Sequence, residues 1–353
     1  MENFNRFAGL ALTAIKSNFG QLDKPYKLNF AVTYWCQSRC LTCNIWQIKP
    51  KGELRIDEIA EFAKKNTSFR WLELTGGEPF LRSDIVNIAE EFYNNCKGLY
   101  MLTMPTNSLC DRAMVEKKLR KILDLGIPKV IMTVSLDGHR DLEDKIRGVK
   151  GNYEKAMSMF DMIHSLKGEY RNIDHFFGYT ISKFNQGELK RTIDSVAADL
   201  SYVTPNDFHV NMGQVSSNYY GNEEMGITAN NVDIVNDIET LLRMRKRNNS
   251  GIGAVEASFL KKLLYYAKTG NPPLRSRSLD ASLFLDSFGN VYPSIMWDRK
   301  VCNIRDTGYD LSKVWRSDEV DALRKEIADG KEPKHWTACE AYQSIVGNIT
   351  SMI

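Results

Sequence analysis

Three cysteines within eight residues are the most reactive group of side chains in this sequence. Cys36, Cys40 and Cys43 lie in the segment Cys-Gln-Ser-Arg-Cys-Leu-Thr-Cys. A structural zinc site takes four ligands, and no fourth Cys or His lies near this segment. Three thiolates on a cubane iron–sulfur cluster would bind three irons and leave the fourth iron open to another ligand. The triplet therefore indicates a cluster at which chemistry can take place.

A second group of residues suits a bound ligand. It is the run Gly76, Gly77, Glu78 and Pro79. Glycines let the backbone approach a bound molecule closely, and proline stiffens the exit of the turn. Backbone groups there could bind an amino group. A Gly-Gly pair alone is typical of an ordinary turn, so this run gains meaning only if it lies beside the cysteines.

Alternating strand and helix patterns place the two groups together. Six β/α units predict a parallel sheet with right-handed crossovers, whose ligands collect at the carboxyl ends of the strands. The cysteine segment follows the first strand, Gly76–Pro79 the second, Asn107 the third and Ser135 the fourth. The expected strands are 28–35, 69–74, 99–105, 129–136, 175–181 and 207–212, with helices at 57–66, 83–95, 111–125, 153–166 and 186–200.

These motifs resemble those of the radical S-adenosylmethionine superfamily. The resemblance spans about residues 27–213 and rests on the spacing of the cysteines, on Gly-Gly-Glu-Pro, and on Ser-Leu-Asp-Gly at 135–138. It implies a partial (β/α)6 TIM-like barrel that holds one 4Fe–4S cluster and S-adenosylmethionine. In this family, the reduced cluster cleaves S-adenosylmethionine to a 5′-deoxyadenosyl radical, which abstracts hydrogen from a substrate. An external one-electron reductant of the flavodoxin or ferredoxin type is then a partner.

The resemblance also assigns roles to individual residues. Cys36, Cys40 and Cys43 would ligate the cluster, and Gly76, Gly77, Glu78 and Pro79 would hold the methionine amino group. Asn107 and Ser135 would lie near the methionine carboxylate or the ribose. Arg147 could bring a guanidinium near a carboxylate, but an exposed arginine at the start of a helix is the favoured interpretation.

The C-terminal part resembles the small SPASM and twitch domains that hold auxiliary clusters, with most cysteines missing. Ser294 stands where a ligand would be expected, and only Cys302, His335 and Cys339 remain as candidate ligands. We therefore expect no auxiliary cluster. The predicted organisation is an N-terminal helix at 1–22, the barrel at 23–215, a helical linker region at 216–273 and a small α+β domain at 274–353.

Composition limits the possible partners and compartments. A net charge of +3 in 353 residues gives no reason to expect nucleic acid. Seven unevenly spread cysteines favour a reducing, cytoplasmic compartment over a disulfide framework. The apolar positions Phe4, Phe7, Ala11, Ile15 and Phe19 recur at helical spacing. They predict a helix docked on the protein, and its few basic residues disfavour contact with a membrane.

Two hypotheses of different kinds follow. The first is a radical S-adenosylmethionine enzyme that acts on a small molecule, lipid, sugar or peptide. The second is a scaffold protein without redox activity, whose cysteine triplet binds zinc with a distant fourth ligand. The Gly76–Pro79 run favours the enzyme, because a zinc scaffold has no use for it.

Overall fold

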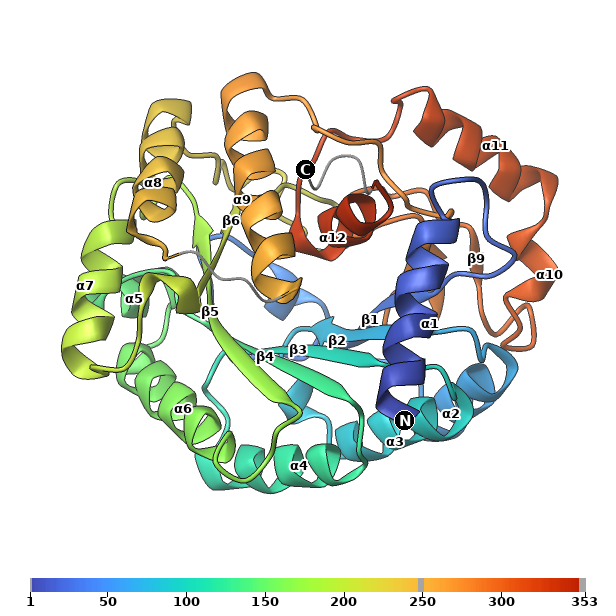
Figure 1. Ribbon diagram of the computed structural model, residues 1–353, viewed down its shortest axis with the longest axis horizontal. Coiled ribbons are helices and arrows are strands. Elements are labelled where there is room, and N and C mark those ends of the chain that lie inside the picture. The colour runs from blue at the N-terminus through green and yellow to red at the C-terminus, as the bar shows by residue number, and fades with distance from the viewer. Residues whose placement is uncertain (1, 247–250, 349–353) are drawn as a thin grey trace.

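A curved parallel sheet forms the centre of the protein (Figure 1). The computed structural model describes residues 2–246 and 251–348. Strands β1 to β6 lie side by side in chain order, all parallel, with helices α2 to α7 on the outer face. The predicted partial (β/α)6 barrel is confirmed. Its elements are β1 (Lys27–Thr33), α2 (Ile56–Lys65), β2 (Trp71–Gly76), α3 (Ile85–Asn95), β3 (Met101–Thr106), α4 (Arg112–Asp124), β4 (Lys129–Ser135), α5 (Arg140–Arg147), α6 (Asn152–Leu166), β5 (Ile173–Ile181), α7 (Leu189–Asp199) and β6 (Phe208–Met212).

Alternation along the strands separates a packed outer face from a more open inner face. In β3, Leu102 and Met104 are buried, while Thr103 and Pro105 are half-buried. The same alternation recurs in β4 and β5. Because successive strand residues point to opposite faces, the large apolar side chains fill the layer between sheet and helices. The inner face is left less tightly packed.

The C-terminal part extends the barrel sheet. Strand β7 pairs in parallel with β1, from Lys27 opposite Ser282 to Phe30 opposite Leu285. The predicted hairpin is confirmed, since β8 runs antiparallel to β7. The proposed division of the chain into domains stays a prediction. The later elements are α8 (Asn231–Met244), α9 (Gly251–Thr269), β7 (Ser282–Leu285), β8 (Asn290–Tyr292), β9 (Cys302–Asn303), α10 (Ser312–Trp315), α11 (Asp318–Ala328) and α12 (Ala338–Val346).

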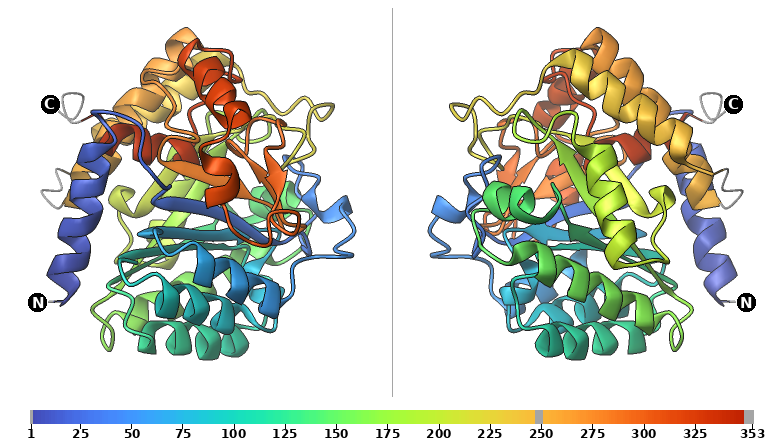
Figure 2. Two further views of the ribbon diagram at one scale, coloured as in Figure 1. Left: turned by 90° about the vertical axis from the view of Figure 1, so that its right-hand side faces the viewer. Right: turned by 90° about the vertical axis from the view of Figure 1, so that its left-hand side faces the viewer.

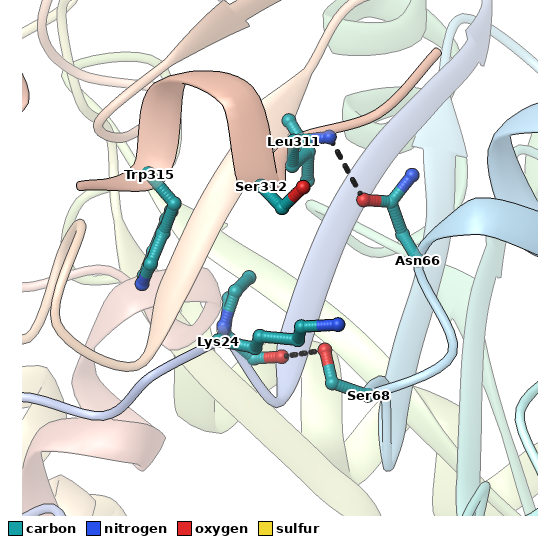
Figure 3. A pocket seen from close by; sticks show the side chains of 7 residues that line it. Lys24, Asn66, Ser68, Leu311, Ser312 and Trp315 are labelled. Atoms are coloured by element: carbon teal, nitrogen blue, oxygen red, sulfur yellow. Dashed lines mark hydrogen bonds between the residues drawn. The ribbon is translucent and has the colours of Figure 1, made fainter. Parts of the chain in front are cut away.

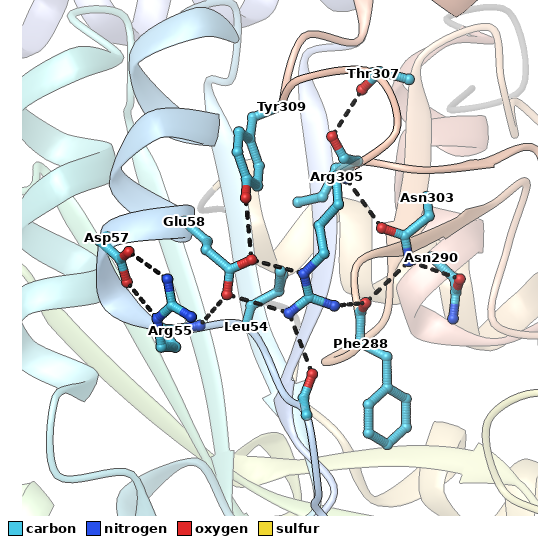
Figure 4. Close-up of polar contacts among 12 residues, drawn as sticks. Leu54, Arg55, Asp57, Glu58, Phe288, Asn290, Asn303, Arg305, Thr307 and Tyr309 are labelled. Carbon is cyan, nitrogen blue, oxygen red and sulfur yellow. Dashed lines mark hydrogen bonds and ion pairs between the residues drawn. The ribbon is translucent and has the colours of Figure 1, made fainter.

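Polar contacts fix this C-terminal part to α2. The Arg305 guanidinium donates to Glu58 at 2.6 Å, and the Tyr309 hydroxyl donates to the same carboxylate at 3.1 Å (Figure 4). The hydrogen bond from Arg305 outweighs partial burial and lowers the pKa of Glu58 to about 2. At a neighbouring hollow, the Leu311 amide donates to Asn66 at 3.0 Å (Figure 3).

Helices α8, α9 and α12 lie on the open side of the barrel (Figures 1 and 2). The Tyr342 hydroxyl of α12 donates to Glu256 of α9, and His209 of β6 contacts the same carboxylate at 3.1 Å. The Lys27 ammonium of β1 lies 3.1 Å from the Gln343 side-chain oxygen of α12. These contacts hold α12 across the inner face, from β1 to β6.

Helix α1 (Glu2–Lys16) lies at the edge of the molecule. The predicted helix docked on the protein is confirmed. The side through which it was expected to dock is wrong, because Phe4, Phe7 and Phe19 are exposed. Its buried side chains are Arg6 and Ala14 instead. Within the described parts of the chain, no helix combines the length and the apolar character needed to cross a bilayer.

Candidate functional site

Backbone hydrogen bonds from two neighbouring segments shape the cysteine loop. The Arg39 amide donates to the Arg147 carbonyl at 2.9 Å, at the end of α5. The Asn44 amide donates to the Tyr220 carbonyl at 2.9 Å, in the segment that follows β6. These contacts are made by the protein itself. Contacts with α5 and with the segment after β6 therefore position the loop.

Each of the three thiols receives a hydrogen bond from nitrogen. The Asn107 amide group donates to Cys36 Sγ at 3.5 Å, Arg147 Nη1 to Cys40 Sγ at 3.8 Å, and the Ile45 backbone N–H to Cys43 Sγ at 3.4 Å. Such donors stabilise negative charge on sulfur and tune iron–sulfur clusters. The donor set therefore fits three thiolates on a cluster.

Burial keeps the free thiols protonated. It raises the pKa of Cys36 and Cys40, and it raises that of Cys43 to about 12. Within residues 2–246 and 251–348, no three His, Cys, Asp or Glu side chains converge as ligands of a single ion. Three thiolates that bind three separate irons do not need to converge on one point. The arrangement gives the zinc hypothesis no support.

The two glycines serve the packing of strand ends. A Cβ on Gly76 would lie 2.1 Å from the Thr33 carbonyl oxygen, and one on Gly77 would lie 2.2 Å from that of Trp35. Gly76 also has φ +119°, which side chains rarely adopt. Only glycine therefore lets the end of β2 lie against the end of β1. The expected role in binding a ligand stays a prediction.

Glu78 connects this turn to the next strand. Its carboxylate is fully buried and accepts hydrogen bonds from the amides of Asn107 at 2.6 Å and Phe80 at 3.2 Å. Burial raises its pKa to about 7. Glu78 thus positions Asn107, whose side chain reaches Cys36. Pro79 begins the short 3-10 helix Pro79–Leu81.

The remaining predicted residue, Ser135, ends β4 on its inner face. It is half-buried and lies opposite Gly178 of β5. The structure thus brings the loops after β1, β2, β3 and β4 to one end of the sheet, as the sequence predicts. The binding roles of Gly76–Pro79, Asn107 and Ser135 stay predictions.

Arg147, Asp137 and Glu143 form a buried charged group beside Cys40 that was not predicted from the sequence. The expectation of an exposed Arg147 is wrong, because its guanidinium is largely buried and lies 2.8 Å from Asp137 and 3.4 Å from Glu143. The Glu143 carboxylate in turn accepts from the Asp137 amide at 2.5 Å. The four-residue spacing of Glu143 and Arg147 on a helix was the available signal.

The candidate ligands of an auxiliary cluster in the C-terminal part are mostly hydrogen-bonded to other protein groups. The Ser294 hydroxyl donates to Glu332 at 2.9 Å. Cys339 donates to Glu73 of β2 at 3.0 Å, while His335 Nδ1 lies 2.7 Å from the Pro333 carbonyl oxygen. Cys302 lies apart, on β9. The structure does not bring these candidate ligands together as one site.

Comparisons with known proteins agree with this site. The family model described as "Radical SAM superfamily" matches residues 30–194 of this chain. The "Fe-coproporphyrin III synthase" of Methanosarcina barkeri is 29% identical over 182 residues, which are 49% of this chain and 41% of that protein. The "AdoMet-dependent heme synthase" of the same organism is 26% identical over 193 residues, 53% of this chain and 50% of that protein. The chain thus spans about half the length of these relatives.

The fold is also found among solved structures. The structure described as "Native anSMEcpe with bound AdoMet" superposes with a TM-score of 0.61 and 14% identity, over 86% of this chain and 84% of that one. At this identity the likeness shows the fold alone. Radical SAM proteins are enzymes that use a 4Fe–4S cluster and S-adenosylmethionine, the two cofactors expected from the sequence. Residues 30–194 of this chain therefore match the radical SAM superfamily.

Proposed function

We propose that this protein reductively cleaves S-adenosylmethionine and abstracts hydrogen from a substrate held on the inner face of its barrel. The observation that carries the proposal is the set of three half-buried thiols, each with its own N–H donor, at the sheet edge where Gly76–Pro79 and Asn107 also lie. When bound, the cluster and S-adenosylmethionine supply the 5′-deoxyadenosyl radical.

The protein's own residues would bind and orient these groups. Cys36, Cys40 and Cys43 hold the cluster. The turn Gly76–Pro79 binds the methionine amino group through its backbone, since the Glu78 carboxylate is already occupied by protein donors. Asn107 and Ser135 contact the carboxylate or the ribose.

The inner face supplies the environment for the substrate. Thr103, Thr133, Thr180 and Asn211 occupy half-buried inner positions on β3 to β6, and none of them is charged. They suit a molecule recognised by hydrogen bonds. Helix α12 crosses this face at Lys27 of β1 and His209 of β6, near the starts of these strands, so it closes the end of the barrel opposite the cysteine loop.

The proposed setting is a reducing cytoplasm with a flavodoxin or ferredoxin as electron donor. All seven cysteines are free thiols, as a reducing compartment requires. A low-potential donor protein would supply the single electron that cleavage consumes.

The test compares two cysteine variants after anaerobic reconstitution. Wild type should hold about four irons per chain and form 5′-deoxyadenosine with dithionite. Cys40→Ala should lose this activity. Cys302→Ala changes a half-buried cysteine away from the site and should keep both iron and activity. Undiminished 5′-deoxyadenosine from Cys40→Ala, or a colourless wild type with one zinc, contradicts the proposal.

A further inference from the structure

Helix α1 and the turn after it present an apolar surface to solvent. Phe4 is 71% exposed, Phe7 50%, Leu12 58%, Ile15 37% and Phe19 87%. We call these five residues the α1 ridge. They are half of the large exposed hydrophobic side chains in the described parts of the chain. Phe4, Leu12 and Ile15 lie on one side of α1. Phe7 lies at the margin of that side, and Phe19 is in the turn that follows the helix.

The opposite side of α1 is the docked side, where Ala14 and Leu10 join a small apolar cluster and polar groups fix both ends. The Arg6 guanidinium is 8% exposed and donates to the Leu99 carbonyl at 3.1 Å. At the other end, Arg277 donates to the Ser17 carbonyl at 2.8 Å. A helix that only covers its own protein buries its apolar side. Here the ridge side chains face outward, on a helix that lies at the edge of the molecule (Figure 2).

Positive charge borders the ridge. Lys16 is exposed on α1 itself, and Lys97 is exposed in the segment against which α1 docks. The Arg70 guanidinium lies between Gly9 and Gly98, since a Cβ on either glycine would meet its Nη1 at 2.5 Å. Across residues 2–246 and 251–348, none of these three cations has an ion-pair partner. Their charge is complementary to anionic groups.

The charge around the ridge argues against a second copy of the chain as its partner. A two-fold interface built on the ridge would bring the same cations of both copies close together, and like charges repel. A narrow apolar ridge with cationic borders instead matches helices that lie in the interfacial region of a bilayer.

We propose that the α1 ridge inserts into the surface of a membrane that contains anionic lipids, with Lys16, Arg70 and Lys97 at the headgroups. This inference does not depend on the proposed function, because it concerns residues outside the cluster site. It places the protein on a lipid surface through a helix that lies along that surface.

The test is flotation of the full chain with vesicles of phosphatidylcholine, alone or mixed with phosphatidylglycerol. Wild type should bind the mixed vesicles more strongly than the neutral ones. Leu12→Glu should weaken binding to mixed vesicles roughly tenfold or more, because the buried leucine contributes at least about 1.5 kcal/mol. Val232→Glu is the matched control, since Val232 is 64% exposed and lies on α8. It should bind like wild type.

Each other outcome overturns the inference. Failure of wild type to float with mixed vesicles does so directly. Equal losses in Leu12→Glu and Val232→Glu would mean that added negative charge, and not the ridge, decides binding. A wild-type dimer in sedimentation that Leu12→Glu dissociates, without vesicle binding, would assign the ridge to a second copy. Thermal unfolding checks that Leu12→Glu is folded, and Phe4→Gln provides a second variant.

Discussion

Arg147 shows how one buried side chain can adjust the chemistry of the site. Its guanidinium contacts Cys40 Sγ and is itself held by Asp137. Reduction of a cluster adds negative charge, and hydrogen bonds and nearby cations stabilise the reduced form. With Cys40 as a cluster ligand, as proposed, Arg147 would act on the cluster through the sulfur, as a positioning residue that also adjusts its potential.

Replacing Arg147 with Met should make the midpoint potential of the cluster more negative. The expected shift is roughly 60 mV, equivalent to a tenfold change in a one-electron equilibrium. A redox titration followed by electron paramagnetic resonance measures it. Arg147→Lys keeps the charge and should shift the potential less. Equal potentials in wild type and Arg147→Met would show that the contact is only structural.

At the scale of elements, β5 and α6 contain a group that responds to acid. His175 of β5 is buried, and its ring lies 4.3 Å from that of Phe160 on α6. Burial lowers its pKa from 6.5 to about 3. The folded protein thus keeps His175 neutral where the unfolded chain binds a proton. Stability that is present above pH 6.5 is lost as the pH falls toward 3.

The variant His175→Phe should unfold less readily in acid. Relative to wild type, its free energy of unfolding should rise by about 1.4 kcal/mol for each pH unit below 6.5. Urea unfolding at several pH values measures this difference. Above pH 7.5, His175 is neutral in both the folded and the unfolded protein. The difference in the free energy of unfolding measured there reflects only the packing of the new ring and serves as the reference. Parallel pH profiles for the two proteins would contradict the assigned cause.

Sequence patterns predicted the elements whose signals are local. Six strands and five of the six helices between them follow from runs of apolar residues, while the short helix α5 was not predicted. The cysteine loop follows from its spacing. The orientation of α1 could not be predicted this way, because periodicity marks an apolar side without saying whether it faces protein or solvent. The burial of Arg147 likewise depends on Asp137 and Cys40, which only the folded chain brings to it.

At the scale of the whole molecule, long-range contacts were the least predictable. Strand β7 has four residues, and nothing in them indicates a parallel partner in β1. The same holds for α12, whose Tyr342 meets Glu256 of α9 on the inner face of the barrel. Such pairings depend on the three-dimensional path of the chain.

Removing the iron should leave the whole protein folded. The cysteine loop is anchored by hydrogen bonds to Arg147 and Tyr220, and the main hydrophobic core does not depend on the cluster. Anaerobic chelation should therefore preserve the far-ultraviolet circular dichroism and a cooperative thermal transition. Small domains built around zinc behave differently, since they unfold without metal. Loss of the transition on chelation would show that the cluster is part of the folding nucleus.

The pairing of β7 with β1 has a consequence for the order in which the chain is made. About 250 residues separate Thr33 from Ser282, so a ribosome adding 5–20 residues per second needs roughly 12–50 s to supply the partner. During that time, the apolar strand β1 has an unpaired edge, and such edges invite aggregation. A nascent chain that stalls before Ser282 should therefore be a substrate for chaperones. Slow translation should increase the risk of aggregation at β1, because its edge stays unpaired for longer.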